Sequence, residues 1–149
     1  MAKNIKHSLF YPHPPEMVWE YLTQPQLIAE WLMPNDFQAV VGHNFQFRTK
    51  PMPNVDFNGI VYCQVLEVVP LKKLSFSWKG GPSDGVITMN SVVEWTLVSK
   101  DGGTELLLEH SFSEISNLDI FSLMDQGWLK NMHKIPNLIN AAKDGIVHT

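Results

Sequence analysis

Apolar and polar residues alternate along much of the chain, which is the pattern of strands that bury one face. The first such segment runs from Ile5 to Tyr11, where the odd-numbered positions alternate with Lys6 and Ser8. Further strands are predicted at residues 37–48, 59–69, 74–78, 86–98 and 104–112. Turn-forming residues separate these segments, most densely from Gly80 to Gly85. The pattern therefore predicts a sheet that makes up most of the chain.

Two short helices are predicted between the first and the second strand. Pro15 suits a first helical turn, because its missing N–H would have had no partner there. Apolar residues then recur at helical spacing as far as Leu22, and the segment 23–25 ends this helix and begins another. The second helix places Trp31 on its buried side and stops at Pro34.

A long amphipathic helix is predicted to close the chain. Ser116 and Asp119 have the spacing of a capping box, and Gly145 is expected to end the helix. Pro136 lies inside this segment and lacks the N–H of an internal helical hydrogen bond, so we expect a kink just before it. The apolar face of this helix comprises Phe121, Met124, Trp128, Met132, Ile135, Ile139 and Ala142.

Strand alternation and the helical face direct aromatic and thioether side chains towards one interior. These side chains admit two interpretations: they fill a core, or they line an adaptable apolar cavity. The sequence leaves both interpretations open. If a cavity is present, the predicted ligand-binding residues are Phe45, Phe47, Tyr62, Trp78, Met89, Trp95, Leu108, His110, Phe112, Trp128 and Met132.

Composition and charge narrow the class of protein. The chain has 149 residues, of which 44% are hydrophobic and 17% charged, and we expect residues 1–149 to form one domain. A net charge of −4 offers no basic face for nucleic acid or for an anionic membrane. No stretch has the pattern of a signal peptide or a membrane span. A surface low in charge permits either a monomer or a homodimer.

Metal and cofactor chemistry is not indicated. The six histidines are scattered without the spacing of a helical zinc site, and no glycine-rich phosphate loop opens a helix. We therefore expect no metal and no cofactor. The single cysteine, Cys63, excludes an internal disulfide and fits a reducing, cytoplasmic compartment. Because it lies in an apolar strand, we interpret it as an unreactive core thiol.

Among the polar residues, His110 is the strongest candidate for a functional role, because alternation places it on the inward side of its strand. The favoured interpretation is a hydrogen-bonded core histidine, and the alternative is a ligand contact or an acid/base group. Tyr62 offers a hydroxyl to the same interior unless a bulge in its strand turns it outward. His110 is thus the candidate catalytic residue, and no second acid or base clearly faces that interior.

Several motifs occur in an order typical of one known family. They are the segment Pro15–Thr23 followed by Trp31, then Gly59 with Glu67–Pro70, then Leu74–Trp78, then Gly103–Leu106 with His110, and finally Gly127-Trp128. With these motifs the chain resembles the proteins similar to the C-terminal domain of the activator of the Hsp90 ATPase. That family belongs to the START/Bet v 1-like (SRPBCC) helix-grip superfamily, and the resemblance covers essentially the whole chain.

This resemblance implies an α+β helix-grip fold. A curved seven-stranded antiparallel sheet, with two short helices after the first strand, packs against a long C-terminal helix, and a hydrophobic cavity often lies between sheet and helix. No single activity is implied, because members of the superfamily bind lipids, hormones or polyketides, some cyclise aromatic polyketides, and the co-chaperone stimulates Hsp90. The chain departs from the usual pattern at Met33-Pro34-Asn35, where a second aromatic residue often follows Trp31, and at Pro136.

Three functions are compatible with these observations. We favour the non-catalytic binding of a small hydrophobic or aromatic molecule. The second is a co-chaperone that stimulates a chaperone ATPase, or another stress-related interaction, although the additional N-terminal domain of the eukaryotic activator has no counterpart in this sequence. The third is a cyclase- or hydrolase-like enzyme that uses His110 and Tyr62 as proton donors and acceptors.

Overall fold

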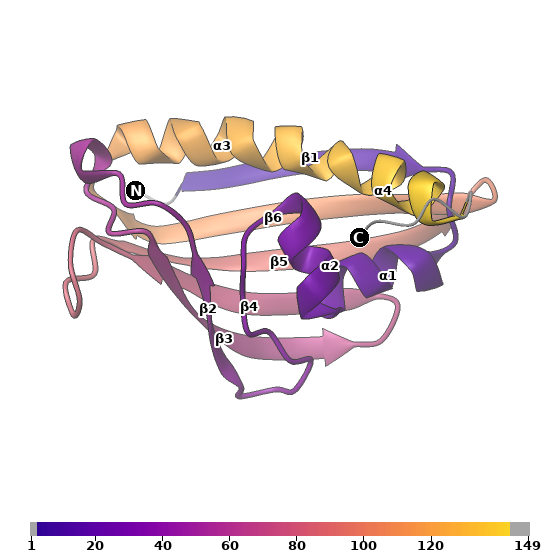
Figure 1. The fold of residues 1–149 in the computed structure, drawn as a ribbon, viewed down its shortest axis with the longest axis horizontal. Helices are drawn as coiled ribbons and strands as arrows, with labels where there is room; N and C mark the ends of the chain where they lie inside the picture. The colour runs from indigo at the N-terminus through magenta and orange to yellow at the C-terminus, as the bar shows by residue number, and fades with distance from the viewer. Residues whose placement is uncertain (1–2, 144–149) are drawn as a thin grey trace.

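The computed structural model describes residues 3–143, in which helices cover one face of a curved antiparallel sheet (Figure 1). Two short helices follow the first strand, as predicted, and two further helices close the described part of the chain. The elements are β1 Lys3–Tyr11, α1 Pro15–Thr23, α2 Pro25–Trp31, β2 Asn44–Arg48, the 3-10 helix η1 Pro53–Val55, β3 Ile60–Val69, β4 Lys73–Gly80, β5 Met89–Lys100, β6 Gly103–Ile115, α3 Leu118–Met132 and α4 Lys134–Lys143.

The strand order places the first two strands at opposite edges of the sheet. The order is β1-β6-β5-β4-β3-β2, and every neighbouring pair is antiparallel. Between β1 and β2 the chain crosses the sheet through α1 and α2, which lie at one end of the face that α3 and α4 also cover (Figure 1). A bulge between Val65 and Glu67 and another between Asn90 and Ser91 interrupt the pairing and add to the curvature.

The described residues form six strands, not the seven that the resemblance implied. Between Arg48 and Ile60 the chain makes a loop that contains η1. Pro51 and Pro53 fall in this loop and lack the N–H that a strand ladder needs. We attribute the missing strand to these prolines, and their loop forms part of the site described below.

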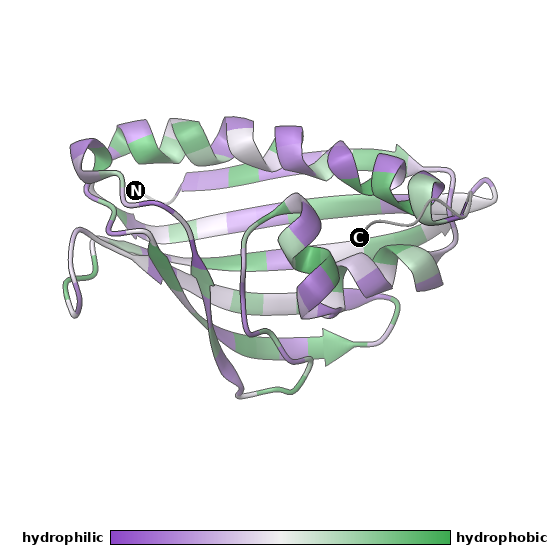
Figure 2. Ribbon diagram, in the orientation of Figure 1, coloured by the Kyte–Doolittle hydropathy of each residue, from purple (hydrophilic) through white to green (hydrophobic). Residues whose placement is uncertain are grey.

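The helix-covered face of the sheet is apolar, as the alternation predicted. In Figure 2 the strands and helices change repeatedly between hydrophobic and hydrophilic colours along their length. The inward residues of the two longest strands are all buried: Met89, Ser91, Val93, Trp95 and Leu97 on β5, and Leu106, Leu108, His110 and Phe112 on β6. The predicted direction of these side chains is therefore confirmed.

The closing helix is broken where Pro136 predicted a kink. α3 ends at Met132 and α4 begins at Lys134. Pro136 has no N–H to donate to the carbonyl of Met132, four residues earlier. That carbonyl instead accepts a hydrogen bond of 2.7 Å from the buried hydroxyl of Tyr11, at the end of β1. Burial raises the pKa of Tyr11 well above its ordinary value, so the hydroxyl remains a donor.

The start of α3 differs from the predicted capping box. Asn117, not Ser116, is the N-cap, and its side-chain oxygen accepts the N–H groups of Asp119 and Ile120 at 3.0 and 3.2 Å. The prediction was wrong by one residue because asparagine caps a helix as well as serine does. Gly145, predicted to end the closing helix, lies outside the described residues.

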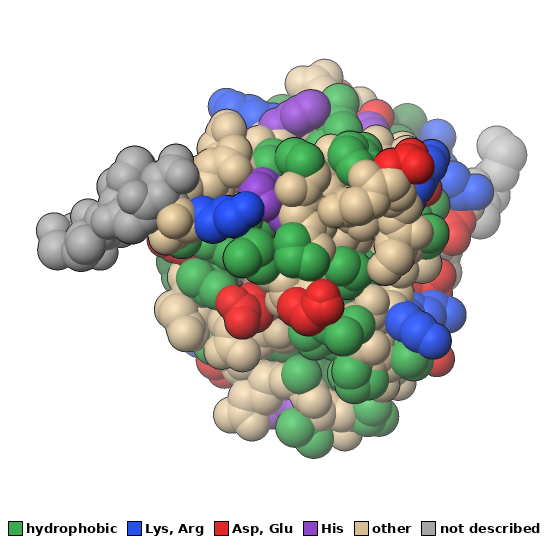
Figure 3. Space-filling model, turned by 90° about the vertical axis from the view of Figure 1, so that its right-hand side faces the viewer, with side chains coloured by type: hydrophobic (Ala, Val, Ile, Leu, Met, Phe, Trp, Pro, Cys, Tyr) green, Lys and Arg blue, Asp and Glu red, His purple; other side chains and the backbone are tan. Residues whose placement is uncertain are grey.

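No helix between residues 3 and 143 combines the length and the hydropathy needed to cross a bilayer. Figure 3 shows the end of the molecule at which α1 and α4 lie. On this face apolar side chains are interspersed with acidic and basic ones, and the lysine and arginine side chains are dispersed.

We predict that Tyr11→Phe lowers the free energy of unfolding by about 1–3 kcal/mol, because it leaves the buried carbonyl of Met132 without a partner. Urea unfolding measures this loss. Pro136→Ala restores an N–H for the same carbonyl, so Tyr11→Phe should cost less in that background than in the wild type. Tyr62→Phe, which removes a hydroxyl at the surface, is the matched control and should cost less than about 0.5 kcal/mol. Equal costs of Tyr11→Phe in both backgrounds would show that the two residues do not act on one carbonyl.

Candidate functional site

A pocket of about 280 Å³ lies between α3 and the sheet. This is where the resemblance implied a cavity. The walls come from the end of α2, the loop between β2 and β3, the three strands β3 to β5, and α3. The lining residues are Leu32, Met33, Thr49, Met52, Phe57, Val61, Trp78, Met89, Ile120, Leu123, Met124, Gly127, Trp128 and Asn131.

Within residues 3–143, the pocket lining is mainly apolar and carries no charged side chain. It includes four methionines, two tryptophans and one phenylalanine, and its polar side chains are those of Thr49 and Asn131. Methionine side chains are flexible and polarisable, so such a wall adapts to the shape of a ligand. In the part of the chain that the structure describes, no group of His, Cys, Asp or Glu side chains could hold a metal ion. The pocket can therefore desolvate an apolar molecule, but it cannot neutralise a buried charge.

Three of the predicted ligand-binding residues line this pocket: Trp78, Met89 and Trp128. Another seven are buried in the core without lining it, namely Phe45, Phe47, Trp95, Leu108, His110, Phe112 and Met132. Strand alternation predicts the side of the sheet to which a residue points, but not whether a second layer of side chains covers it. One part of the aromatic interior is therefore a filled core, and another part lines a cavity.

Tyr62 does not face the interior. Its hydroxyl donates a hydrogen bond of 2.9 Å to Asp84 at the surface. On β3 the buried residues on either side are Val61 and Cys63, so simple alternation turns Tyr62 outward. The bulge in this strand comes later, after Val65, and is not the cause.

Several lining residues carry no direct signal in the sequence pattern. Met52 and Phe57 belong to the proline-containing loop before β3, whose path depends on tertiary contacts. Met33 stands at the position where the chain departs from the usual family pattern. Met124 is an exception, because it lies on the predicted apolar face of the closing helix, near Trp128. Its position on this face could have identified it as a lining residue.

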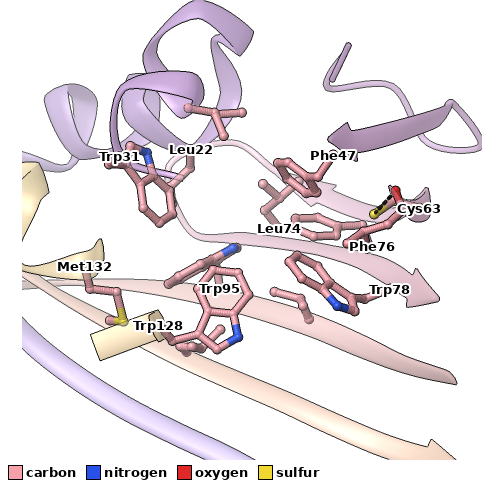
Figure 4. Close-up of a cluster of buried hydrophobic side chains, with 14 of the residues drawn as sticks. Leu22, Trp31, Phe47, Cys63, Leu74, Phe76, Trp78, Trp95, Trp128 and Met132 are labelled. Carbon is pink, nitrogen blue, oxygen red and sulfur yellow. Dashed lines mark hydrogen bonds between the residues drawn. The ribbon is translucent and has the colours of Figure 1, made fainter. Parts of the chain in front are cut away.

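Four tryptophans form a continuous series of contacts behind and beside the pocket (Figure 4). Trp31 of α2 meets Trp95 of β5 edge-on, with ring centroids 5.8 Å apart. Trp95 meets Trp128 of α3 in the same way at 5.5 Å, and Trp128 lies 5.2 Å from Trp78 of β4. Such aromatic pairs add stability beyond their buried area and restrict how the rings can turn. Contacts with the core thus fix the orientation of the two tryptophans that line the pocket, Trp78 and Trp128.

Buried hydrogen bonds connect the same two tryptophans through His110 and Ser91. The indole N–H of Trp128 donates to Nδ1 of His110 at 3.0 Å. Because an indole nitrogen only donates, Nδ1 carries no hydrogen, and Nε2–H of His110 donates to Oγ of Ser91 at 2.8 Å. The Ser91 hydroxyl donates in turn to the backbone carbonyl of Trp78 at 2.7 Å. Every group in this series has a partner.

The environment keeps His110 neutral. Its side chain is fully buried, and burial lowers the pKa of His110 to about 3. Both ring nitrogens are engaged, and His110 does not line the pocket. Its geometry is that of a core histidine that positions Trp128. Cys63 is likewise buried, and burial raises the pKa of its thiol well above the ordinary value.

The buried indole N–H of Trp78 differs from that of Trp128. Among the described residues, Nε1 of Trp78 has no hydrogen-bond partner. The N–H of Trp31, by comparison, donates to the carbonyl of Tyr21 at 2.8 Å. A buried polar group without a partner is uncommon in folded proteins and calls for a physical explanation.

A curved antiparallel sheet, closing helices and an apolar pocket between them define a helix-grip domain of the START/Bet v 1-like (SRPBCC) class. The sequence model of one family within this class, described as Activator of Hsp90 ATPase homolog 1-like protein, matches residues 12–140. The chain belongs to this family. A search of curated protein sequences found no match.

Several solved structures are similar to this chain. Protein MLL2253 from Mesorhizobium loti is 34% identical, with a TM-score of 0.81 over 93% of this chain and 97% of that one. Protein BH1534 from Bacillus halodurans is 26% identical, with a TM-score of 0.69 over 92% and 96% of the two chains. The Aha1 dimer from Colwellia psychrerythraea is 17% identical, with a TM-score of 0.69 over 91% and 94%, which shows a shared fold.

We predict that His110 makes the protein less stable in acid. Unfolded histidine has a pKa of about 6.5, so between pH 6.5 and about 3 the unfolded chain takes up a proton that the folded chain does not. The stability contributed by neutral His110 is present above pH 6.5 and is lost as the pH falls. The loss amounts to about 2–3 kcal/mol between pH 6.5 and 4.5.

Urea unfolding at pH 7 and at pH 4.5 measures this effect. His110→Gln should lose less stability between the two pH values than the wild type, by about 2 kcal/mol. His133→Gln, at an exposed position between α3 and α4, is the control and should keep the wild-type difference. If His110→Gln showed the same difference as the wild type, His110 would not be the group that titrates.

Proposed function

We propose that the protein binds one small, neutral, hydrophobic or aromatic molecule in the pocket between α3 and the sheet, without changing it chemically. The observation that carries this proposal is the pocket itself, about 280 Å³ of space with a lining free of charged side chains. The fold of this family, which is commonly a ligand-binding scaffold, supports the same function.

The composition of the lining favours this class of ligand. Each Å² of apolar surface that a ligand removes from water contributes roughly 25 cal/mol, and the pocket offers aromatic and thioether surface for this purpose. A charged ligand would lose its hydration without gaining an ion pair. None of the described Asp, Glu, His, Lys or Cys side chains lines the pocket, so these residues supply no general acid or base there, which is why the proposal is one of binding.

The domain organisation belongs to the same proposal. The sheet and all the described helices enclose one continuous core, so we propose that residues 1–149 act as one binding domain. The dimeric state of the Colwellia psychrerythraea protein suggests that a homodimer is one arrangement to test for this chain.

Native mass spectrometry of protein purified gently from its own host is the direct test. A released small molecule at near-stoichiometric occupancy, neutral and mainly apolar, is the expected result. A co-purifying charged metabolite would contradict the proposal, because the lining has no group to pair with it.

We predict that Gly127→Leu blocks the pocket without unfolding the protein. Gly127 lines the pocket from α3, and a Cβ added there meets nothing within 4 Å. The leucine side chain would therefore enter the pocket, and replacing a helical glycine should stabilise α3 by about 0.5–1 kcal/mol. We expect the affinity for N-phenyl-1-naphthylamine, a neutral fluorescent probe, to fall by about tenfold or more.

Gln126→Leu is the matched control, because it adds the same side chain at an exposed position of α3 that does not line the pocket. This variant should bind the probe as the wild type does. Unchanged probe binding by a folded Gly127→Leu protein would place the binding site elsewhere.

A further inference from the structure

Trp78 lines the pocket, and its buried indole N–H has no acceptor among the described residues. The Trp78 side chain is 3% exposed, so water in bulk does not supply the missing acceptor. The other pocket tryptophan, Trp128, has its N–H bonded to His110. One of the two tryptophans that line the pocket therefore carries an unused hydrogen-bond donor.

Two arrangements can compensate this donor. One is a weak contact of the N–H with a neighbouring aromatic ring, since the centroid of Trp128 lies 5.2 Å from that of Trp78. The other is an acceptor atom on the bound molecule. A hydrogen bond made in a water-poor pocket discriminates strongly, because an analogue without the acceptor leaves the donor unpaired.

We propose that the bound molecule is a neutral aromatic compound with one hydrogen-bond acceptor oxygen, such as an aromatic ketone, and that this oxygen accepts the N–H of Trp78. The inference rests on the proposed function and specifies the ligand class for the same pocket. A charged ligand is excluded because the lining has no charged side chain to pair with it. One acceptor on the ligand suffices because the polar lining residues Thr49 and Asn131 are not buried and do not need a partner from the ligand.

The ligand reaches the indole edge by displacing side chains, not backbone. Nε1 of Trp78 is covered in the structure. The pocket lining includes Met89 and Met124, whose unbranched side chains change rotamer at low cost. The backbone of Trp78 itself stays in place, because its carbonyl accepts the Ser91 hydroxyl at 2.7 Å.

The test compares two probes of nearly equal shape, 9-fluorenone and fluorene, which differ by a carbonyl oxygen in place of two hydrogens. Both are titrated against N-phenyl-1-naphthylamine on the wild type, on Trp78→Phe and on Trp95→Phe. Trp95 is a buried aromatic residue outside the pocket and controls for general loosening of the core. We expect the wild type and Trp95→Phe to prefer fluorenone by about three- to tenfold, and Trp78→Phe to lose this preference.

A spectroscopic measurement on the wild type keeps the test independent of how the variants fold. The five tryptophans give five indole N–H signals in a ¹⁵N-correlated NMR spectrum. Fluorenone should move one of them downfield and lower the carbonyl stretching frequency of the bound ketone, and fluorene should produce no such downfield shift.

The outcomes separate the inference from the proposed function. Equal binding of the two probes, with no hydrogen-bonded indole signal, would overturn the inference and leave apolar binding standing. Absence of binding by either probe and by N-phenyl-1-naphthylamine would overturn both. A fluorenone preference that survives in folded Trp78→Phe would assign the oxygen to another donor and also overturn the inference.

Discussion

The series of buried hydrogen bonds from Trp128 through His110 and Ser91 to the backbone of Trp78 is the contact that positions α3 on the sheet. Hydrophobic packing alone would allow the helix to slide or turn, because apolar contacts have little directional preference. A buried indole N–H, an imidazole and a hydroxyl each need a hydrogen-bond partner, and the observed placement of α3 provides one for each. The position of α3 in turn determines where the pocket wall stands.

A second constraint divides the interior into a filled end and a hollow end. The break between α3 and α4 lets α4 bury Ile135 and Ile139 in the core, at the end of the sheet that α1 and α2 also cover (Figure 1). At the other end, the proline-containing loop approaches α3 and is joined to its N-cap by a 3.0 Å hydrogen bond between Asn117 and Asp56. This loop contributes Thr49, Met52 and Phe57 to the wall of the pocket.

Much of the fold could be predicted from local pattern. The alternation along β5 and β6 identified the inward faces, and Pro136 indicated the break in the closing helix, because both depend on residues close in sequence. The site was only partly predictable. Trp78, Met89 and Trp128 line the pocket, whereas Trp95 and Phe47 point the same way but are covered by α2 and its neighbours. Depth within an interior depends on what packs on top, which periodicity does not describe.

The sequence by itself determined the order of the strands and helices and an apolar interior rich in aromatic side chains, since these follow from composition and periodicity, and its resemblance to a known family implied the class of fold. Only the tertiary structure decided that Tyr11 serves the carbonyl released by Pro136, that His110 uses both nitrogens within the core, and that Trp78 retains an unused N–H beside the pocket. Each of these joins residues distant in sequence. Whether a buried polar group finds a partner depends on positions within a few tenths of an ångström, and only the packed chain defines those positions.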